Sequence, residues 1–176
     1  MTLAADGGSN RALVGERGSR ASLVTPALVL DLDALERNIA TMAAHAKRTG
    51  VALRPHVKTH KSVEIARRQL AAGAIGFCAA TLGEAQALVR AGLPGVLITS
   101  PVVPSAKIEA LARLNAQADD LMVVLDHPHN LAALEAAATK AGRPLGVVID
   151  LDVGLQDRKS TRLNSSHVSE SRMPSS

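Results

Sequence analysis

The stretch that decides the fold runs from Val51 to Ser62 and reads VALRPHVKTHKS. Its apolar start leads through Arg54 and Pro55 into a cluster of ionisable side chains, namely His56, Lys58, His60 and Lys61. An apolar strand that ends in such a cluster and is followed by a helix is typical of a βα-barrel, because barrel chemistry lies at the carboxyl ends of the strands. Lys58 is therefore the central candidate residue.

Length and composition limit what this centre can be. A chain of 176 residues can form one domain with a full core, and 47% hydrophobic with 20% charged residues is ordinary globular composition. Phe77 is the one aromatic residue, so the core must consist of Ala, Val, Leu and Ile. The lone Cys78 excludes an internal disulfide and fits a reducing compartment, so we expect a cytoplasmic protein. No membrane span is expected, and residues 1–22 read as a flexible leader without a secretory signal.

The net charge of +4 has to be located before it is interpreted. Residues 157–176 hold four basic and two acidic side chains, which is half of the excess; the other residues hold 16 basic and 14 acidic ones. That larger part shows no basic stripe with aromatic residues for base stacking. The charge therefore gives no reason to expect nucleic acid as a partner.

Residues 157–176 differ in composition from the rest of the chain. They read DRKSTRLNSSHVSESRMPSS, with no apolar periodicity and much serine, so we expect disorder. DRKSTRLNSSH resembles the in-frame translation of a common sequencing adapter, and SRMPSS resembles its continuation. We therefore interpret this segment, His167 included, as a non-native tail; a natural disordered tail is the alternative.

The remaining body alternates predicted strands and helices at a period of about 20 to 25 residues. The strands are expected at 25–31, 51–55, 74–80, 96–99, 121–125 and 145–150, and the helices at 33–49, 63–72, 82–90, 105–115 and 130–141. Asp33 is predicted to cap the first helix and Gly50 to end it. Thr81 and Glu84 form a predicted capping box, which we take as the only role of Glu84.

The predicted strands are apolar throughout, which favours a parallel sheet covered by helices. Such a sheet can be doubly wound or part of a barrel. A doubly wound sheet predicts a glycine-rich turn after its first strand, and the loops contain neither G-x-G-x-x-G nor a Walker pattern. The barrel is therefore the predicted α/β architecture.

Lys58 can be interpreted in two ways from its surroundings. A lysine at a strand end becomes a nucleophile toward carbonyls when desolvation or neighbouring positive charge lowers its pKa. The candidates to supply that charge are Arg54, Lys61, His56 and His60. Alternatively, the basic cluster binds an anion or solvates a loop. The residues alone leave both interpretations open.

The other candidate residues have structural alternatives as well. His56 and His60 flank Lys58 at a two-residue spacing, so on an extended segment all three would point the same way and share a site; ordinary loop histidines are the alternative. His127 and His129 are expected to cap a helix or face solvent, and Cys78 to be buried and unreactive.

Asp150 and Asp152 end the last predicted strand on the presumed active edge. They could support the site electrostatically, or they could cap a helix or bind a loop through hydrogen bonds. The residues again leave both possibilities open.

Four segments together carry a resemblance to a known family: TPALVLDLDALERNI, RPHVKTHKS, IGFCAATLGEAQAL and VIDLDVG. In this order they resemble the pyridoxal-phosphate enzymes of the D-threonine aldolase and D-serine dehydratase family, which are relatives of the alanine racemase amino-terminal barrel. The resemblance covers residues 23–155. It implies a (β/α)8 barrel with a carboxyl-terminal β domain, truncated here after about five barrel strands, and residues 23–156 as a partial cofactor-binding domain.

The resemblance also implies chemistry. Lys58 matches the lysine that carries pyridoxal 5'-phosphate covalently, and His56 and His60 would be cofactor contacts. The family's reactions imply a lyase that acts on D-β-hydroxy amino acids, either by retro-aldol cleavage to glycine and an aldehyde or by dehydration. A divalent metal (Mn, Mg or Zn) is expected in the full-length protein only, without ligands in this chain.

Further expectations concern assembly and the chain as it stands. A homodimeric full-length protein is expected, with neither nucleic acid nor membrane as a partner. Arg158 is one residue late for an arginine of the family, so we assign it no role. We expect the 176-residue chain to be inactive and to aggregate or remain partly folded. The alternative function is that of the non-catalytic pyridoxal-phosphate homeostasis proteins, which keep the barrel and the lysine.

Overall fold

The computed structural model describes residues 8–151. The predictions for Asp152 and for the tail at 157–176 therefore lie outside the described residues. The chain divides into two compact units, residues 1–38 and 39–176, and each is considered by itself. None of the helices described in either unit is both long and apolar enough to cross a membrane.

The first unit holds two short helical turns, α1 (Gly8–Arg11) and the 3-10 turn η1 (Ser19–Ser22). The side chain of Asn10 both donates to and accepts from the backbone of Val24, at 2.8 Å each. The predicted strand at 25–31 is wrong, because the structure has no strand there and no described strand pairs with it. Without a partner strand, the side chains of Leu28, Val29 and Leu30 are exposed.

Helix α2 (Leu32–Thr49) shows why one capping prediction fails. The Asp31 carboxylate accepts a hydrogen bond from the Ala34 N–H at 2.9 Å, so Asp31 rather than Asp33 caps the helix. Asp33 lies in the first turn, where its negative charge interacts favourably with the positive end of the helix dipole. The predicted end is confirmed: Gly50 follows the helix with φ of 69°, a left-handed conformation that suits glycine.

The second unit contains a parallel sheet of four strands: β1 (Phe77–Ala79), β2 (Val96–Ile98), β3 (Met122–Leu125) and β4 (Gly146–Ile149). All neighbours pair in parallel, and their order in the sheet follows their order in the chain. A doubly wound sheet reverses its order at a switch point, whereas a barrel does not. The barrel-type α/β architecture is thus confirmed, with an open sheet rather than a closed barrel.

A barrel strand was expected at 51–55, and the structure shows this stretch and the two residues after it beside β1 with a single bridge, His56 to Cys78. Pro55 O accepts from Cys78 N at 2.8 Å, and Val57 N donates to Cys78 O at 2.9 Å. Pro55 has no N–H to donate to Gly76 O, so the regular pairing stops there, and toward its start the segment keeps only the hydrogen bond from Ile75 N to Leu53 O at 2.9 Å. The described sheet therefore has four regular strands, not five.

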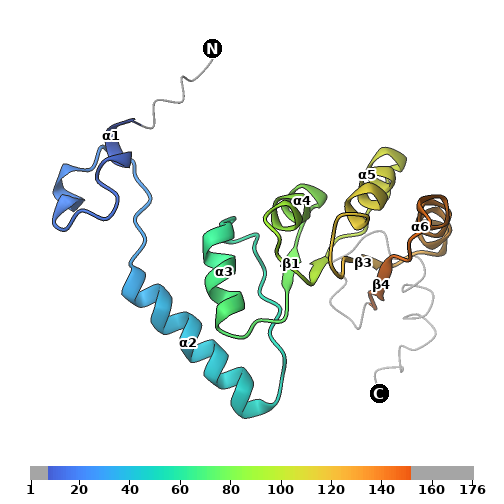
Figure 1. The fold of residues 1–176 in the computed structure, drawn as a ribbon, viewed down its shortest axis with the longest axis horizontal. Coiled ribbons are helices and arrows are strands. Elements are labelled where there is room, and N and C mark those ends of the chain that lie inside the picture. The colour runs from blue at the N-terminus through green and yellow to red at the C-terminus, as the bar shows by residue number, and fades with distance from the viewer. Residues whose placement is uncertain (1–7, 152–176) are drawn as a thin grey trace, which may run out of the picture. The chain divides into compact units, whose positions relative to one another are not determined.

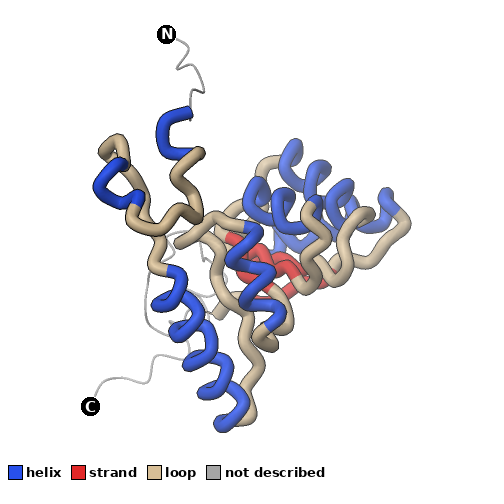
Figure 2. Tube along the Cα trace, turned by 60° about the vertical axis from the view of Figure 1, so that its left-hand side comes forward, coloured by secondary structure: helices blue, strands red, loops and turns tan. Residues whose placement is uncertain are grey.

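Four helices follow the strand segments: α3 (Val63–Ala71), α4 (Leu82–Arg90), α5 (Ser105–Asn115) and α6 (Pro128–Ala141). Helices α4, α5 and α6 lie on one side of the sheet (Figures 1 and 2), as right-handed crossovers between strands in sequential order require. The core lies between these layers, and its largest fully buried side chains are Phe77, Val96, Ile98, Leu111 and Val123.

The other face of the sheet corresponds to a barrel interior. The pairing places Cys78, Leu97, Met122 and Gly146 in one row across the four strands. In β1 and β2 the residues of this row are partly exposed while their neighbours on the helix side are buried. This face ends, at the carboxyl ends of the strands, in the candidate site.

Candidate functional site

Lys58 lies in a tight turn, residues 57–61, that follows the extended segment beside β1. Lys61 N donates to Val57 O at 2.8 Å, which closes the turn. The expectation that His56, Lys58 and His60 point the same way is therefore wrong, because it assumed an extended backbone. The structure brings His56 close to Lys58 and turns His60 elsewhere.

His56 connects Lys58 to the end of the neighbouring strand β2. Its Nδ1 accepts a hydrogen bond from the Lys58 N–H at 3.3 Å, and its Nε2 lies 3.2 Å from Thr99 Oγ1. The Thr99 hydroxyl donates to Ala79 O at 3.1 Å, so toward His56 it acts as the acceptor. These contacts assign a neutral imidazole that carries its proton on Nε2.

The charge state of His56 agrees with this network. Burial lowers its pKa, the positive charge of Lys58 lowers it further, and Glu84 opposes both effects. A protonated ring would place a donor on Nδ1 opposite the Lys58 N–H. The neutral form thus holds the backbone of Lys58 in position.

His60 contributes to the packing of α3. Its Nδ1 accepts from Ser62 N at 3.1 Å, next to the cap where Ser62 Oγ accepts from Ile65 N at 3.3 Å. Burial lowers the pKa of His60, while interactions with Gln69 and with the Ser62 backbone raise it. A cofactor contact of His60 stays a prediction, and its visible contacts are with the start and the body of α3.

The two histidines predict a pH dependence of stability. Because both have a folded-state pKa below the ordinary 6.5, the unfolded chain binds more protons below that pH than the folded chain does. The stability that their neutral forms contribute is complete above pH 6.5 and is lost as the pH falls through the lowered pKa values. We expect the urea concentration at the unfolding midpoint to decrease as the pH is lowered from 7.5 to 5.5. The double variant His56→Asn, His60→Asn should show a weaker fall; an equal fall would contradict the assignment.

Glu84 does more than the capping box predicts. Its N–H donates to Thr81 Oγ1 at 3.2 Å, which confirms half of the box. Its carboxylate accepts from Ala80 N at 2.8 Å and from the Lys61 ammonium. The hydrogen bond from Lys61 is the largest cause of the lowered pKa of Glu84. Glu84 therefore joins the turn at 57–61 to the loop between β1 and α4.

Lys58 differs from Lys61 in its side-chain contacts. Lys58 is exposed, and its amine makes no hydrogen bond or ion pair with any residue between positions 8 and 151. The Lys61 ammonium is taken up by Glu84. Of the two lysines in the turn, Lys58 is thus the one whose amine is available to a ligand.

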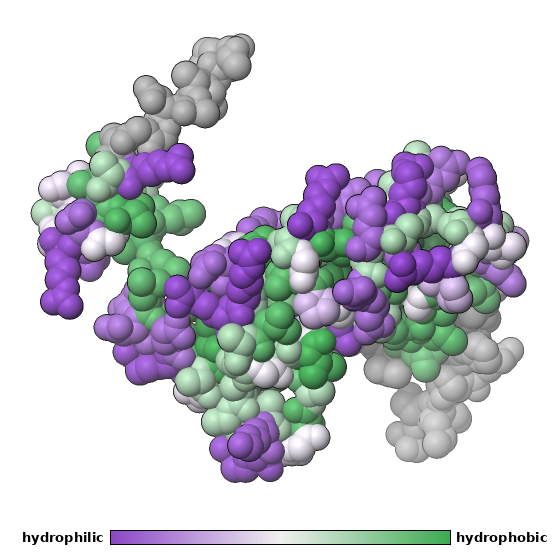
Figure 3. Space-filling model, in the orientation of Figure 1, coloured by the Kyte–Doolittle hydropathy of each residue, from purple (hydrophilic) through white to green (hydrophobic). Residues whose placement is uncertain are grey.

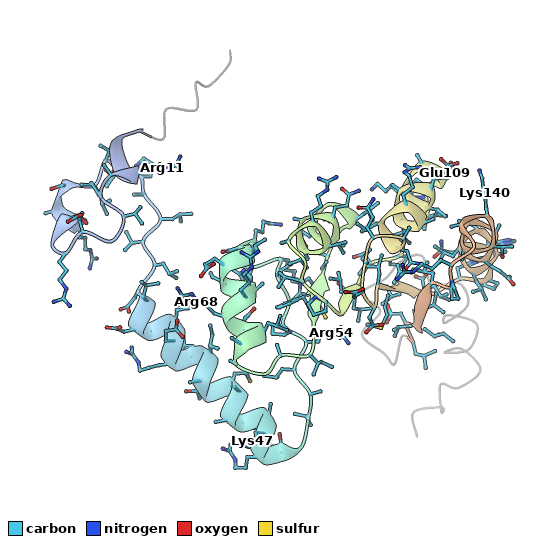
Figure 4. The ribbon with its side chains drawn as sticks, in the orientation of Figure 1. Arg11, Lys47, Arg54, Arg68, Glu109 and Lys140 are labelled. Atoms are coloured by element: carbon cyan, nitrogen blue, oxygen red, sulfur yellow. The ribbon has the colours of Figure 1, made fainter. Side chains whose placement is uncertain are left out.

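Arg54 does not supply charge to Lys58 as expected. Its guanidinium donates to Gly95 O and lies against Gly76, so it sits where β1 and β2 begin (Figure 4). Lys58 follows the opposite, carboxyl-terminal end of that sheet region. The prediction is wrong because Arg54 precedes Lys58 along an extended segment, which carries the two side chains apart.

Two residues of this edge were missed in the sequence. Thr99 follows β2 and binds His56; Asp126 follows β3, is only 4% exposed, and its Oδ2 has no hydrogen-bond partner among residues 8–151. A buried carboxylate oxygen without a partner is costly, and such costs gather at functional sites. The signal was available, since both directly follow apolar strands, as Asp150 does.

The remaining candidates have structural roles. His127 Nδ1 accepts from His129 N at 3.2 Å and caps α6, which confirms the capping prediction, and the two rings stack at 5.0 Å. Burial raises the pKa of the Cys78 thiol, which keeps it protonated. Within residues 8–151, no three His, Cys, Asp or Glu side chains gather as a metal site would require.

Comparisons with known proteins agree with this geometry. Residues 30–163 match the family described as alanine racemase, N-terminal domain. The chain is 44% identical over 131 residues to a 3-hydroxy-D-aspartate aldolase of Paracoccus denitrificans, covering 74% of this chain and 34% of the relative. It is 40% identical over 131 residues to a D-threo-3-hydroxyaspartate dehydratase of Delftia sp., covering 74% and 34%.

A solved structure shows the same similarity in three dimensions. The crystal structure of D-threonine aldolase from Filomicrobium marinum superposes with a TM-score of 0.76 at 43% identity, covering 79% of this chain and 37% of that one. The chain spans about a third of the length of the curated relatives it matches. The family match covers more than half of the chain, and the chain therefore belongs to the family of alanine racemase N-terminal domains.

Proposed function

We propose that this chain is the cofactor-binding part of a pyridoxal-phosphate-dependent lyase that acts on D-β-hydroxy amino acids. The observation that carries the proposal is the exposed amine of Lys58. It lies at the carboxyl-terminal edge of a barrel-type sheet, without a carboxylate partner among the described residues. An amine in this position can react with the aldehyde group of the cofactor.

The described residues fit the reactive end and the ring of pyridoxal phosphate. Lys58 offers the amine, and neutral His56 holds the lysine backbone. Leu97 and Met122 lie in the apolar row on the barrel-interior face that leads to this edge. When bound, pyridoxal phosphate supplies a ring that accepts an electron pair as a bond to the α-carbon of an amino acid breaks.

The residues of this chain would have distinct tasks. Lys58 would attach the cofactor, and the His56–Thr99 pair would fix the turn that carries it. Asp126 would place a carboxylate at the same edge, where it could attract the ammonium group of an amino acid. The described residues supply no set of phosphate-binding groups, and the proposal places none in this chain.

The substrate class and the compartment rest on the relatives and the composition. The three relatives compared with this chain are two aldolases and one dehydratase for D-β-hydroxy amino acids, which favours a lyase over a non-catalytic cofactor-binding protein. We propose that the whole protein is a cytoplasmic homodimer. It would also need a divalent metal, whose ligands would come from residues outside this chain. The proposed lyase reaction is either an aldol cleavage or a dehydration.

Reductive labelling tests the role of Lys58 on the chain itself. Treatment of its monomeric fraction with pyridoxal phosphate and borohydride should label Lys58 above every other lysine, because its exposed amine lies at the carboxyl-terminal edge of the sheet, beside the apolar row that would receive the cofactor ring. Peptide mapping by mass spectrometry measures the label. The Lys58→Ala variant should lose the main labelled peptide, whereas Lys107→Ala, which changes an exposed lysine of α5, should keep it. Equal labelling of all lysines would refute the proposal.

The reaction itself is tested with the full-length protein. Incubation with D-threonine should give glycine and acetaldehyde if the protein is an aldolase, and incubation with D-serine should give pyruvate and ammonia if it is a dehydratase. The Lys58→Ala variant should lose either activity by a factor of at least about 10³. Turnover that survives in this variant would exclude Lys58 as the cofactor lysine.

A further inference from the structure

We propose that Glu84 is a specificity-determining residue that withholds Lys61 from aldehydes and so directs the cofactor to Lys58. The inference rests on the proposed function, because it concerns the choice between two lysines at the same site. Both lysines lie in one turn, three positions apart. A second reactive amine there would capture the aldehyde in a position without the His56 contact.

The contacts of Glu84 are those that such a role needs. One carboxylate oxygen accepts from Ala80 N at 2.8 Å, which fixes the carboxylate to the end of β1. The other accepts from the Lys61 ammonium. The Glu84 side chain is only 12% exposed, whereas that of Lys61 is 66% exposed. Glu84 is thus a fixed anion that holds an otherwise mobile, solvent-accessible cation.

The backbone of Lys61 supports the same conclusion. Its φ is 47°, in the left-handed region that a lysine rarely adopts. Lys61 N donates to Val57 O at 2.8 Å, which fixes the direction in which the side chain leaves the turn. The turn therefore sends Lys61 toward Glu84 on α4, while Lys58 meets no carboxylate among residues 8–151.

The chemical consequence follows from the proton. An amine attacks an aldehyde through its lone pair, and the Lys61 nitrogen must leave the Glu84 carboxylate before it can do so, whereas Lys58 has no carboxylate partner among the described residues. The hydrogen bond from Lys61 lowers the pKa of Glu84, which keeps the carboxylate ionised near neutral pH and able to hold Lys61. Lys61 is thereby slowed toward aldehydes relative to Lys58.

The experiment measures the ratio of label on Lys61 to label on Lys58. Pyridoxal phosphate and borohydride join the lysine nitrogen to the aldehyde carbon, release the carbonyl oxygen as water and use hydride to leave a stable secondary amine. In the monomeric 176-residue chain, Lys58 should carry most of the label. Glu84→Gln should raise the ratio roughly threefold to fivefold, the size expected for a partly exposed ion pair.

Two controls separate selectivity from general effects of substitution. Glu109→Gln removes a carboxylate from an exposed pair on α5, far along the chain from the turn (Figure 4), and should leave the ratio unchanged. Lys61→Arg keeps an ion pair with Glu84 but removes the amine, and should leave the labelling of Lys58 unchanged. Circular dichroism checks that each variant is folded.

A measurement on the unaltered chain covers the case in which Glu84→Gln does not fold. Salt screens a partly exposed ion pair, so the ratio should rise between low and high ionic strength. The inference would be overturned if Lys58 is labelled but neither Glu84→Gln nor salt changes the ratio of label on Lys61 to label on Lys58. That result would leave the proposed function intact. Failure to label Lys58 in Lys61→Arg would instead overturn the proposed function.

Discussion

The Gly95→Ala variant should unfold at much lower urea concentration than the unaltered chain, with a loss of about 3 kcal/mol or more in the free energy of unfolding. Two costs add. Gly95 has φ of 64°, where a Cβ costs roughly 1–2 kcal/mol. An added Cβ would also lie 2.6 Å from Ile75 O and 3.0 Å from the Arg54 guanidinium. The backbone oxygen belongs to the segment before β1 and cannot move aside without disturbing the sheet.

Gly142 is a matched control for this prediction. Its φ is 65°, nearly the same as that of Gly95, but nothing lies within 4 Å of an added Cβ. Gly142→Ala should therefore cost only the backbone part, about 1 kcal/mol. Urea unfolding followed by circular dichroism measures both variants. Equal losses in the two variants would show that the contacts of an added Cβ at Gly95 with Ile75 O and the Arg54 guanidinium add nothing to the loss of stability.

The elements of the sheet region could be predicted closely because their signals are local. Helix α5 occupies the residues predicted for it, and Thr81 caps α4 as expected. A capping hydroxyl can be predicted because its partner, a backbone N–H in the first turn of the helix, lies only a few residues away. The choice of a barrel-type sheet over a doubly wound one also followed from the absence of a glycine-rich turn. These features depend on spacing within about ten residues.

The failed predictions depend on contacts between distant segments. Residues 25–31 have the composition of a strand, but pairing needs a second strand that composition does not reveal. Arg54 binds Gly95, 41 residues later, and His56 reaches Thr99, 43 residues later. The turn that separates His60 from Lys58 follows from a backbone hydrogen bond that periodicity cannot show.

Glu84 illustrates the same limit at the candidate site. Its spacing from Thr81 predicted a capping box, and that part is confirmed. Its contact with Lys61 spans 23 residues, so no motif within the helix indicates it. Lys58 could be singled out from the sequence because its surroundings are contiguous, whereas Thr99 and Glu84, which contact its turn through His56 and Lys61, come from two other parts of the chain.

The chain at high concentration should associate through the outer edge of β4. Among residues 8–151, no strand pairs with that edge, and Val147, Val148, Ile149 and Leu151 are all at least 39% exposed. Green hydrophobic surface is visible at this edge in Figure 3. An apolar strand with unpaired backbone groups is a template for pairing with another copy. Light scattering and gel filtration against concentration measure the association.

Proline substitutions can separate edge pairing from loss of the fold. In a parallel ladder the N–H groups point alternately to the two sides. Asp150 N donates to Leu125 O at 2.9 Å, so the N–H of Val148 also faces β3, whereas that of Ile149 faces outward. Ile149→Pro should therefore keep the pairing of β3 with β4 while removing an edge donor, because proline is tolerated at sheet edges.

We expect Ile149→Pro to weaken association roughly ten- to hundredfold, since a symmetric pair of copies loses two hydrogen bonds of about 1 kcal/mol each together with the apolar contact of the isoleucine. Val148→Pro is the contrasting variant. It removes a donor that faces β3 and should lower the urea midpoint, because β3 is buried and β4 would lose its place beside it. Association that is as strong in Ile149→Pro as in the unaltered chain would place the contact on another surface, such as the exposed side chains of residues 28–30.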